Sequence, residues 1–289
     1  MKERITGYTQ LIGLIATPIR HSKSPIMHNT AFQALDLDYV YLVFEVGPDH
    51  LKETVEGLKA MDARGWNVSM PNKTVIGQYL DHITPVASLC GAINTVINDD
   101  GVLTGTITDG TGYMRSLKEA GIDIIGKKMT IVGAGGAATA ICIQAALDGV
   151  KEISIFNRND EFYERGIQNA KIINEKTDCQ ATFFPLEDHE ALKREIDDSV
   201  IFINATNVGM HPLEDQMILP DIHYLRHDII VSDVIYAPEK TKLLQEAEAL
   251  GCQTINGIGM MLYQGAEAFQ LWTGHDMPID EVKKALNFK

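Results

Sequence analysis

The hydrophobic pattern of the chain alternates between two kinds of segment along its whole length. Short, continuous apolar runs are typical of buried strands, and the longer segments between them carry apolar residues at helical spacing. Strands that alternate with helices predict a parallel α/β architecture. We expect strands at 11–15, 39–44, 66–69, 92–98, 103–108, 129–132, 152–156, 182–184, 200–204 and 229–234. We expect helices at 25–34, 49–61, 73–79, 111–120, 137–147 and 240–250, with a long and a short one from 259 onward.

One strand–helix junction is rich in glycine. The apolar run 129–132 leads into Gly133-Ala134-Gly135-Gly136-Ala137, and small residues continue as a helix. Glycine lets backbone N–H groups approach a diphosphate, and the positive end of the helix stabilises that anion. A further strand at 152–156 completes the context that this motif requires. The junction therefore predicts that residues 133–137 bind a dinucleotide; the alternative is a tight turn without a ligand.

The position of this junction suggests how the chain is divided. A length of 289 residues suits one large domain or two of ordinary size. We expect a Rossmann-type, doubly wound parallel sheet over 111–257 and an N-terminal α/β substrate domain over 1–110. Because the Rossmann unit is complete by residue 257, we expect the helices of 258–289 to return to the first domain.

Composition and charge narrow the class of protein. The chain has 25 basic and 39 acidic residues, a formal net charge of −14, which argues against nucleic acid or an anionic membrane as partner. No stretch reaches the ~20 apolar residues of a membrane span, and no apolar signal core follows Met1-Lys2-Glu3-Arg4. Four scattered cysteines and nine histidines without metal spacing predict reduced thiols and no metal site. We therefore expect a cytoplasmic protein, and a homodimer stays open.

Polar residues near the ends of the expected strands are candidates for chemistry. Ser22 and Ser24 precede a proline at a helix start, where two hydroxyls form a neutral cradle for a carboxylate or simply cap the helix. Lys73 lies where a strand ends and a helix starts, and it suits a proton shuttle, although a single lysine is by default solvated. Asn94 and Asp109 lie at strand ends, where polar side chains point into a cleft or form turns.

Eight ordered motifs carry a resemblance to a known family. They are His-Ser-x-Ser-Pro at 21–25, Val-Ser-Met-Pro-Asn-Lys at 68–73, Gly-Ala-Ile-Asn-Thr at 91–95, Thr-Asp-Gly at 108–110, Gly-Ala-Gly-Gly-Ala at 133–137, Phe-Asn-Arg at 156–158, Asn-Ala-Thr at 204–206 and the tail 257–264. With these motifs over essentially its whole length, the chain resembles the shikimate dehydrogenases, and more closely the quinate/shikimate dehydrogenase branch. The resemblance implies an oxidoreductase that interconverts shikimate and 3-dehydroshikimate, or quinate and 3-dehydroquinate, by hydride transfer with a nicotinamide dinucleotide.

The resemblance also implies roles for individual residues. It makes Lys73 and Asp109 the acid–base pair. It implies that the hydroxy-acid substrate contacts Ser22, Ser24, Ser69, Asn94, Thr108, Tyr236 and Gln264, with Tyr41 a weaker candidate. It implies that the dinucleotide contacts Asn157, Thr206, Asn207, Val234, Tyr236 and Gly257 besides 133–137. One departure is Ile107, because the family usually has Asn two residues before the catalytic Asp.

The residues after 152–156 bear on the choice of dinucleotide. An acidic group at this strand end bonds the ribose 2′-hydroxyl of NAD and repels the 2′-phosphate of NADP. Asp160 therefore argues for NAD, whereas Arg158 argues for tolerance of NADP, since a guanidinium pairs well with phosphate. The resemblance also favours NAD, because Asn159-Asp160-Glu161 follows as in the NAD-using branch. We expect NAD(H), with NADP possible.

Three other functions stay open. The first is an NADP-dependent shikimate dehydrogenase of aromatic amino-acid biosynthesis, which Asp160 weighs against. The second is another two-domain dehydrogenase acting on folate or amino-acid substrates, which the Ser-x-Ser and Lys–Asp motifs weigh against. The third is a ligand sensor that keeps the fold without turnover. The presence of Lys73 and Asp109 argues against a sensor, and Ile107 leaves it open.

Overall fold

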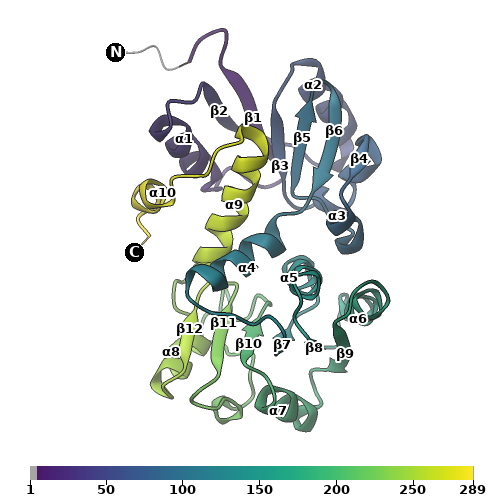
Figure 1. Ribbon diagram of the computed structural model, residues 1–289, viewed down its shortest axis with the longest axis vertical. Helices are drawn as coiled ribbons and strands as arrows, with labels where there is room; N and C mark the ends of the chain where they lie inside the picture. Colours follow the sequence, from purple (N-terminus) through teal and green to yellow (C-terminus); the bar gives the residue numbers. More distant parts are fainter. Residues whose placement is uncertain (1–4, 289) are drawn as a thin grey trace. The chain divides into compact units, whose positions relative to one another are not determined.

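The computed structural model describes residues 5–288 and confirms the α/β class. Residues 1–4, on which the expectation about a signal core rests, lie outside the described residues. The chain forms two compact units: residues up to Thr108 together with the segment from Gln264 onward, and Asp109–Tyr263. Each unit has its own sheet and helices (Figure 1).

The first unit contains a six-stranded mixed sheet. Its strands are β1 (Gln10–Ala16), β2 (Tyr39–Glu45), β3 (Gly65–Val68), β4 (His82–Ile83), β5 (Thr95–Asp99) and β6 (Val102–Thr106). The order is β2-β1-β3-β5-β6-β4, parallel among β2, β1 and β3, with β5 antiparallel to both β3 and β6. Its helices are α1 (Ser24–Ala34), α2 (Leu51–Ala60), α3 (Pro85–Cys90), α10 (Ile279–Leu286) and the later part of α9 (Ile258–Thr273). Because β5 is antiparallel to β3, the residue that precedes β5 lies beside the end of β3.

The segment 73–79 does not form the expected α-helix. It is split between two short 3-10 helices, η2 (Asn72–Thr74) and η3 (Ile76–Tyr79). The run of β-branched residues at 74–76, followed by Gly77, lowers helix propensity enough that a continuous α-helix is not formed. The candidate lysine therefore lies in a tight turn directly after β3.

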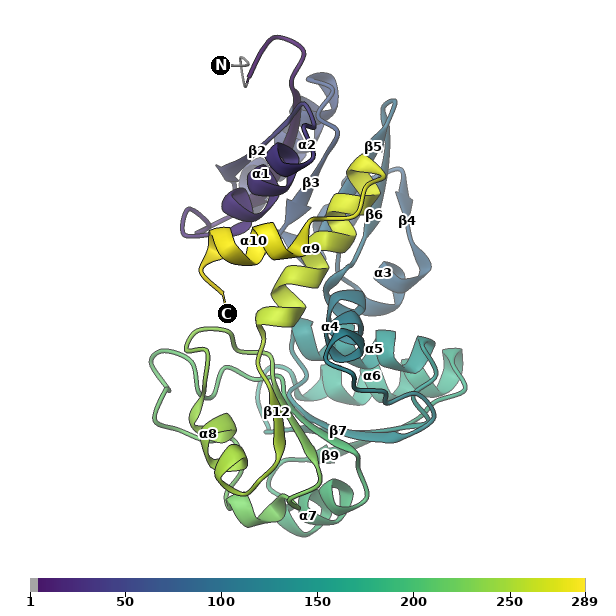
Figure 2. The ribbon, with the colours of Figure 1, turned by 60° about the vertical axis from the view of Figure 1, so that its left-hand side comes forward.

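The later part of α9 and the whole of α10 belong to the first unit. α10 packs against α1 (Figure 2). Trp272, near the end of α9, is 2% exposed, and its indole N–H donates to the Val96 carbonyl at 2.9 Å. Arg64 in turn donates from Nε to the Trp272 carbonyl at 2.8 Å. The division between the units falls inside α9, at Gln264, because one uninterrupted helix carries the chain past residue 257.

The second unit contains a six-stranded, all-parallel sheet. Its strands are β7 (Lys128–Val132), β8 (Glu152–Asn157), β9 (Gln180–Pro185), β10 (Ile201–Asn204), β11 (Ile230–Asp233) and β12 (Gln253–Ile255). The order β12-β11-β10-β7-β8-β9 is the doubly wound Rossmann order, with its switch point between β7 and β10. Its helices are α4 (Asp109–Glu119), α5 (Gly136–Leu147), α6 (Tyr163–Lys176), α7 (His189–Asp197) and α8 (Lys242–Ala249). α4, α5 and α6 lie on one face of the sheet and α7 and α8 on the other (Figures 1 and 2).

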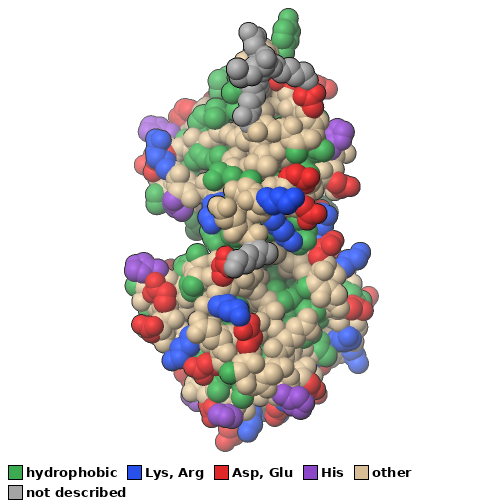
Figure 3. Space-filling view, turned by 90° about the vertical axis from the view of Figure 1, so that its left-hand side faces the viewer, with side chains coloured by type: hydrophobic (Ala, Val, Ile, Leu, Met, Phe, Trp, Pro, Cys, Tyr) green, Lys and Arg blue, Asp and Glu red, His purple; other side chains and the backbone are tan. Residues whose placement is uncertain are grey.

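The surface of each unit is mixed in character. Figure 3 shows acidic, basic and apolar side chains interspersed on the face that it presents of each unit. Within residues 5–288, no helix is both long and apolar enough to cross a membrane.

Candidate active site

The two candidate serines lie at the start of α1. The helix begins at Ser24, and its N-cap residue, Lys23, makes no side-chain cap bond. The Ser24 N–H donates to Ser22 Oγ at 3.2 Å, and both serines are half-buried. Ser24 therefore occupies the first turn and does not cap α1, so the capping interpretation is wrong. Both serines are next to the positive end of an 11-residue helix, which favours an anion.

Backbone hydrogen bonds bring the turn after β3 against the segment before β5. The Ile93 N–H donates to the Lys73 carbonyl at 2.8 Å, and the Val68 N–H donates to the Asn94 carbonyl at 2.8 Å. Ser69 follows β3 directly, and its N–H donates to the Ile15 carbonyl of β1 at 3.1 Å. The main chains of three predicted site residues, at 69, 73 and 94, are thereby fixed at one edge of the sheet.

The Asn94 side chain bonds two other predicted substrate residues, Thr108 and Gln264. Its Oδ1 accepts from the Thr108 N–H at 2.9 Å, and its Nδ2 donates to Thr108 Oγ1 at 3.0 Å and to Gln264 Oε1 at 3.5 Å. Asn94 and Thr108 are each 3% exposed. Asp109 follows Thr108 directly and is the first residue of α4. Ile107, the departure from the family pattern, is itself buried, with 3% exposed.

Sequence reasoning missed Asn67 and underrated Tyr41. The Tyr41 hydroxyl donates to Asn67 Oδ1 at 2.7 Å, and Asn67 Nδ2 donates to the Asn94 carbonyl at 3.1 Å. Burial raises the pKa of Tyr41, and a hydrogen bond with Ser24 opposes the rise, so Tyr41 stays a protonated donor. This chain of bonds holds the main-chain carbonyl of Asn94 in place. The signal that could have identified Asn67 is its place inside β3, a strand whose four residues are all buried.

The glycine-rich turn of the second unit fits a diphosphate. Gly133 has φ +120°, and a Cβ there would lie 2.6 Å from the Ala205 carbonyl oxygen, so a side chain has no room. Gly135 and Gly136 differ, because a Cβ on either would meet nothing within 4 Å. Gly135 is the N-cap of α5 and makes no side-chain cap bond. The helix start is therefore bare backbone facing open space, as a bound diphosphate requires.

Asp160 is used within its own turn. Its Oδ1 accepts from Asn157 Nδ2 at 2.8 Å and from the Phe162 N–H at 2.9 Å, and its Oδ2 accepts from Arg158 Nε at 2.8 Å. Partial burial opposes ionisation, but the bonds from Arg158, Phe162 and Asn157 outweigh it and lower the pKa of the Asp160 carboxyl. The Arg158 side chain is 59% exposed. The acidic residue therefore shapes the turn and is paired with the cation beside it.

The remaining dinucleotide candidates follow β10, β11 and β12. The Val234 N–H donates to the Asn204 carbonyl at 3.0 Å, and the Gly257 N–H donates to the Ile235 carbonyl at 2.9 Å. A Cβ on Gly257 would collide with the Val234 carbonyl oxygen, so this close approach requires glycine. Tyr236 is 41% exposed. The second unit thus gathers Gly133–Ala137, Asn157, Arg158, Asp160, Thr206, Asn207, Val234, Tyr236 and Gly257 at the carboxyl ends of its strands.

The predicted site residues divide between the two units along the chain. The first unit carries Ser22, Ser24, Ser69, Lys73, Asn94, Thr108 and Gln264. Asp109 and Tyr236 belong to the second unit, with the dinucleotide candidates.

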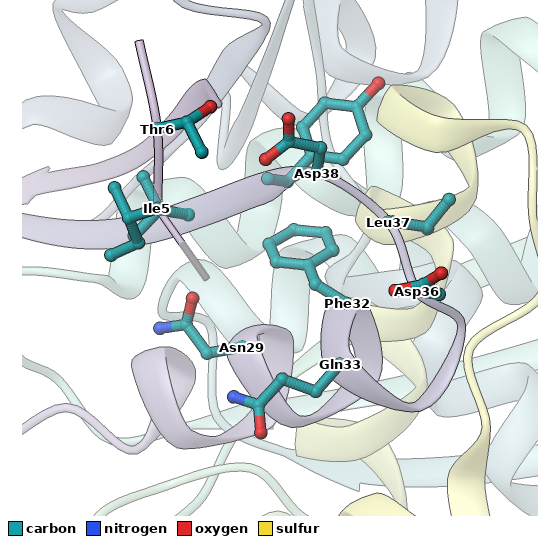
Figure 4. Close-up of a pocket in the computed structure, with 10 residues that line it drawn as sticks. Ile5, Thr6, Asn29, Phe32, Gln33, Asp36, Leu37 and Asp38 are labelled. Atoms are coloured by element: carbon teal, nitrogen blue, oxygen red, sulfur yellow. The ribbon is translucent and has the colours of Figure 1, made fainter. Parts of the chain in front are cut away.

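A cavity of about 730 Å³ lies elsewhere in the first unit. Figure 4 shows Asn29, Phe32 and Gln33 of α1 on one side and Asp38, which precedes β2, on another. None of the predicted site residues lines it. The cavity is therefore separate from the candidate active site.

Comparison with known proteins identifies the family of the chain. Residues 14–96 match the family described as the shikimate dehydrogenase substrate binding domain, and residues 257–286 match the shikimate 5'-dehydrogenase C-terminal domain. A curated protein of Listeria monocytogenes named shikimate dehydrogenase (NADP(+)) is 67% identical over 284 residues, 98% of each chain.

Solved structures agree as well. Shikimate 5-dehydrogenase from Listeria monocytogenes, in complex with shikimate and NAD, is 67% identical with a TM-score of 0.97 and 99% of each chain covered. Quinate dehydrogenase from Corynebacterium glutamicum, in complex with NAD, is 27% identical with a TM-score of 0.87, covering 96% of this chain and 99% of that one. The chain is thus far more similar to these Listeria proteins, which are named for shikimate, than to this quinate enzyme. It is an oxidoreductase that belongs to the shikimate dehydrogenase family.

Proposed function

We propose that the protein catalyses the NADP⁺-dependent oxidation of shikimate to 3-dehydroshikimate and the reverse reduction. The observation that carries this proposal is the hydrogen-bonded Asn94–Thr108–Gln264 cluster next to the main chain of Lys73, in a chain 67% identical to a shikimate dehydrogenase (NADP(+)). This replaces the expectation of an NAD-linked quinate/shikimate enzyme with what was first the alternative.

Three observations bear on the cofactor. The name of the 67% identical relative favours NADP⁺, and the internal pairing of Asp160 with Arg158 supports it, because a paired carboxylate repels a 2′-phosphate less. The complex of a Listeria relative with NAD supports use of NAD as well. NADP⁺ is therefore proposed as the preferred cofactor and NAD⁺ as the slower one.

The dinucleotide supplies a nicotinamide ring that accepts a hydride from the substrate. Backbone N–H groups of Gly135, Gly136 and Ala137 at the start of α5 bind the diphosphate. Arg158 binds the 2′-phosphate through the terminal nitrogens of its exposed guanidinium. Thr206, Asn207 and the backbone at Gly257 line the nicotinamide end.

The residues of the first unit bind and orient shikimate. Ser22 and Ser24 donate hydroxyl hydrogen bonds to the carboxylate, and Ser69 assists. Asn94 and Gln264 fix ring hydroxyls, because both side chains carry amide donors and acceptors and are held by the hydrogen bond between them. Lys73 and Asp109 remove the proton from the reacting hydroxyl as its carbon loses hydride, and they return it in the reverse direction.

The first test is an initial-rate assay of shikimate and quinate, each with NADP⁺ and NAD⁺ at equal concentration. We expect the shikimate–NADP⁺ rate to be the highest of the four. Highest turnover with NAD⁺ would overturn the cofactor proposal, and highest turnover with quinate would overturn the substrate proposal.

The second test removes the proton carrier. Lys73→Ala should lower kcat by about 10²–10⁴-fold, the range for general acid–base catalysis. The control is Lys52→Ala, an exposed lysine of α2 paired with Glu56, which should keep the wild-type rate. Equal rates for both variants, with both folded by circular dichroism, would contradict the role of Lys73.

A further inference from the structure

A buried carboxylate, Asp233, ends β11 and has no part in the reaction proposed above. It is 1% exposed, and three donors converge on its two oxygens. Oδ2 accepts from Thr241 Oγ1 at 2.7 Å and from Asn204 Nδ2 at 3.1 Å, and Oδ1 accepts from the Ile235 N–H at 3.0 Å. Burial raises the pKa of the Asp233 carboxyl, and the bonds from Ile235, Thr241 and Asn204 oppose the rise. A buried group with this many partners strongly fixes the segments that supply them.

The bond from Asn204 connects Asp233 to the loop after β10. Asn204 and Asp233 are register partners at the ends of neighbouring parallel strands. Asn204 Oδ1 accepts from the Thr206 hydroxyl at 2.7 Å and from the Thr206 N–H at 3.1 Å, while Nδ2 also donates to the Val208 carbonyl at 3.0 Å. Both sides of Asn207 are therefore held by one side chain, whose orientation is set by Asp233.

The other two donors connect Asp233 to the remaining dinucleotide segments. The Ile235 N–H bond fixes the turn from Val234 to Tyr236, and the Ile235 carbonyl accepts from the Gly257 N–H at 2.9 Å. Thr241 is the N-cap of α8. A Cβ on Gly209 would lie 3.1 Å from Thr241 Cβ, so Thr241 also closes the far end of the loop after β10.

We infer that Asp233 is the positioning residue for the nicotinamide end of the dinucleotide site. It holds Thr206–Asn207, Val234–Tyr236 and Gly257 in one arrangement and acts through them, without contacting the ligand. The inference rests on the proposed function, which assigns these segments to the cofactor. The adenosine end depends on different groups, the turn at Gly133–Ala137 and Arg158, which follow β7 and β8.

Asparagine cannot replace Asp233 in this network. A carboxylate accepts at both oxygens, whereas an amide accepts at one and donates at the other. If the amide oxygen keeps Thr241 and Asn204, its NH₂ group faces the Ile235 N–H. If the amide is flipped, its NH₂ group faces Asn204 Nδ2. Either orientation leaves two donors in contact, so Asp233→Asn displaces one of the held segments.

The experiment compares a whole dinucleotide with its adenosine half. NADPH and adenosine 2′,5′-bisphosphate are titrated into the wild type, Asp233→Asn, Thr241→Val and Thr241→Ser, by NADPH fluorescence and by calorimetry. We expect Asp233→Asn to raise Kd for NADPH by about tenfold or more, while Kd for the bisphosphate changes by less than about twofold. Thr241→Val should also raise Kd for NADPH. Thr241→Ser, which keeps the hydroxyl, should bind NADPH as tightly as the wild type does. Asp148→Asn is the control for the chemical change, because the Asp148 carboxylate accepts a hydrogen bond from Gln144 of α5. This variant should leave the affinity for both ligands unchanged.

Two results would overturn the inference. Equal weakening of both ligands in Asp233→Asn would make the residue merely structural, and no weakening of NADPH would remove its role. If Asp233→Asn does not fold, the comparison of Thr241→Val with Thr241→Ser decides the question in the same way. Failure of the proposed function is seen separately, as absence of shikimate turnover by the wild type.

Discussion

At the scale of single residues, His28 shows how burial sets a protonation state. It is 0% exposed, neither ring nitrogen has a hydrogen-bond partner, and its ring stacks on Tyr41 with centroids 4.5 Å apart. Phe32, Phe269 and Trp272 surround it. Desolvation lowers its pKa to about 3, so the folded protein holds this histidine neutral.

We expect His28 to destabilise the fold in acid. The unfolded chain binds a proton at His28 below about pH 6.5, and the folded chain does not until about pH 3, so stability is lost as the pH falls through that window. From pH 7 to 5 the contribution is about 2 kcal/mol. His28→Phe should lose correspondingly less free energy of unfolding between these two pH values, as measured by urea titration. The other histidines are present in both proteins and cancel, so equal losses would contradict this account.

Arg158 is the residue on which the choice of dinucleotide depends. If its guanidinium binds the 2′-phosphate, Arg158→Ala should raise KM for NADP⁺ by about tenfold or more, since a charge-assisted bond is lost. KM for NAD⁺, which has no 2′-phosphate, serves as the internal control and should change little. An equal rise in both constants would show that the variant disturbs the turn through Asp160 instead.

The same turn shows why a residue type alone did not decide the cofactor. Asp160 was read from the sequence as a free acceptor for a ribose hydroxyl. In the structure its carboxylate accepts three hydrogen bonds from residues of its own turn. One of them comes from Arg158, the cation that argues for tolerance of NADP. Pairing between residues two apart in a turn depends on side-chain geometry, which no spacing rule gives.

At the scale of elements, the turn from β7 to α5 separates two uses of glycine. Gly133 needs its positive φ and has no room for a side chain, whereas Gly135 has φ −70° and open space beside it. The first glycine therefore serves the fold, and the second keeps space for a ligand.

Gly135→Val should leave the fold intact and block the dinucleotide. A Cβ at this position meets nothing within 4 Å, so the thermal midpoint should shift by only a few degrees, about 1 kcal/mol, the cost of losing a favourable N-cap residue. KM for NADP⁺ should rise by about tenfold or more, because the diphosphate loses its close approach to the backbone. Gly133→Ala is the contrast and should lower the thermal midpoint clearly. Unchanged NADP⁺ kinetics in Gly135→Val would show that the diphosphate binds elsewhere.

Most strands were predicted from the sequence, but the helices α3, α6 and α7 were not. The Rossmann strands β7, β8, β10 and β11 are almost fully buried and rich in apolar residues, so the α/β class and the glycine-rich turn could be predicted. β4 has two residues and β12 three, too few to show a period, and both went unpredicted. Candidate residues of the site came from motifs. The bonds of Asn67, Asn204 and Asp233 did not, because they join distant segments through buried side chains.

At the scale of the whole molecule, the first unit is built from both ends of the chain. Trp272 brings the C-terminal segment into its core, where Gly65 leaves space for the indole ring. Trp272→Ala should destabilise the protein by about 3–5 kcal/mol, the usual cost of deleting a buried large aromatic side chain. Leu271→Ala is the matched control, since Leu271 is the neighbour of Trp272 and is 45% exposed, and it should change stability by less than about 0.5 kcal/mol. Similar denaturant midpoints for the two variants would contradict the structural role of this segment.

The discontinuous first unit has a consequence for the order in which the protein matures on the ribosome. Domains generally fold as units while the chain is being made, with the N-terminal one first. Here the stretch 109–263 emerges in full before any of the residues that complete the N-terminal core. The first unit therefore begins to be translated before the second unit but is completed after it, and its face at Gly65 stays uncovered until Trp272 has been made.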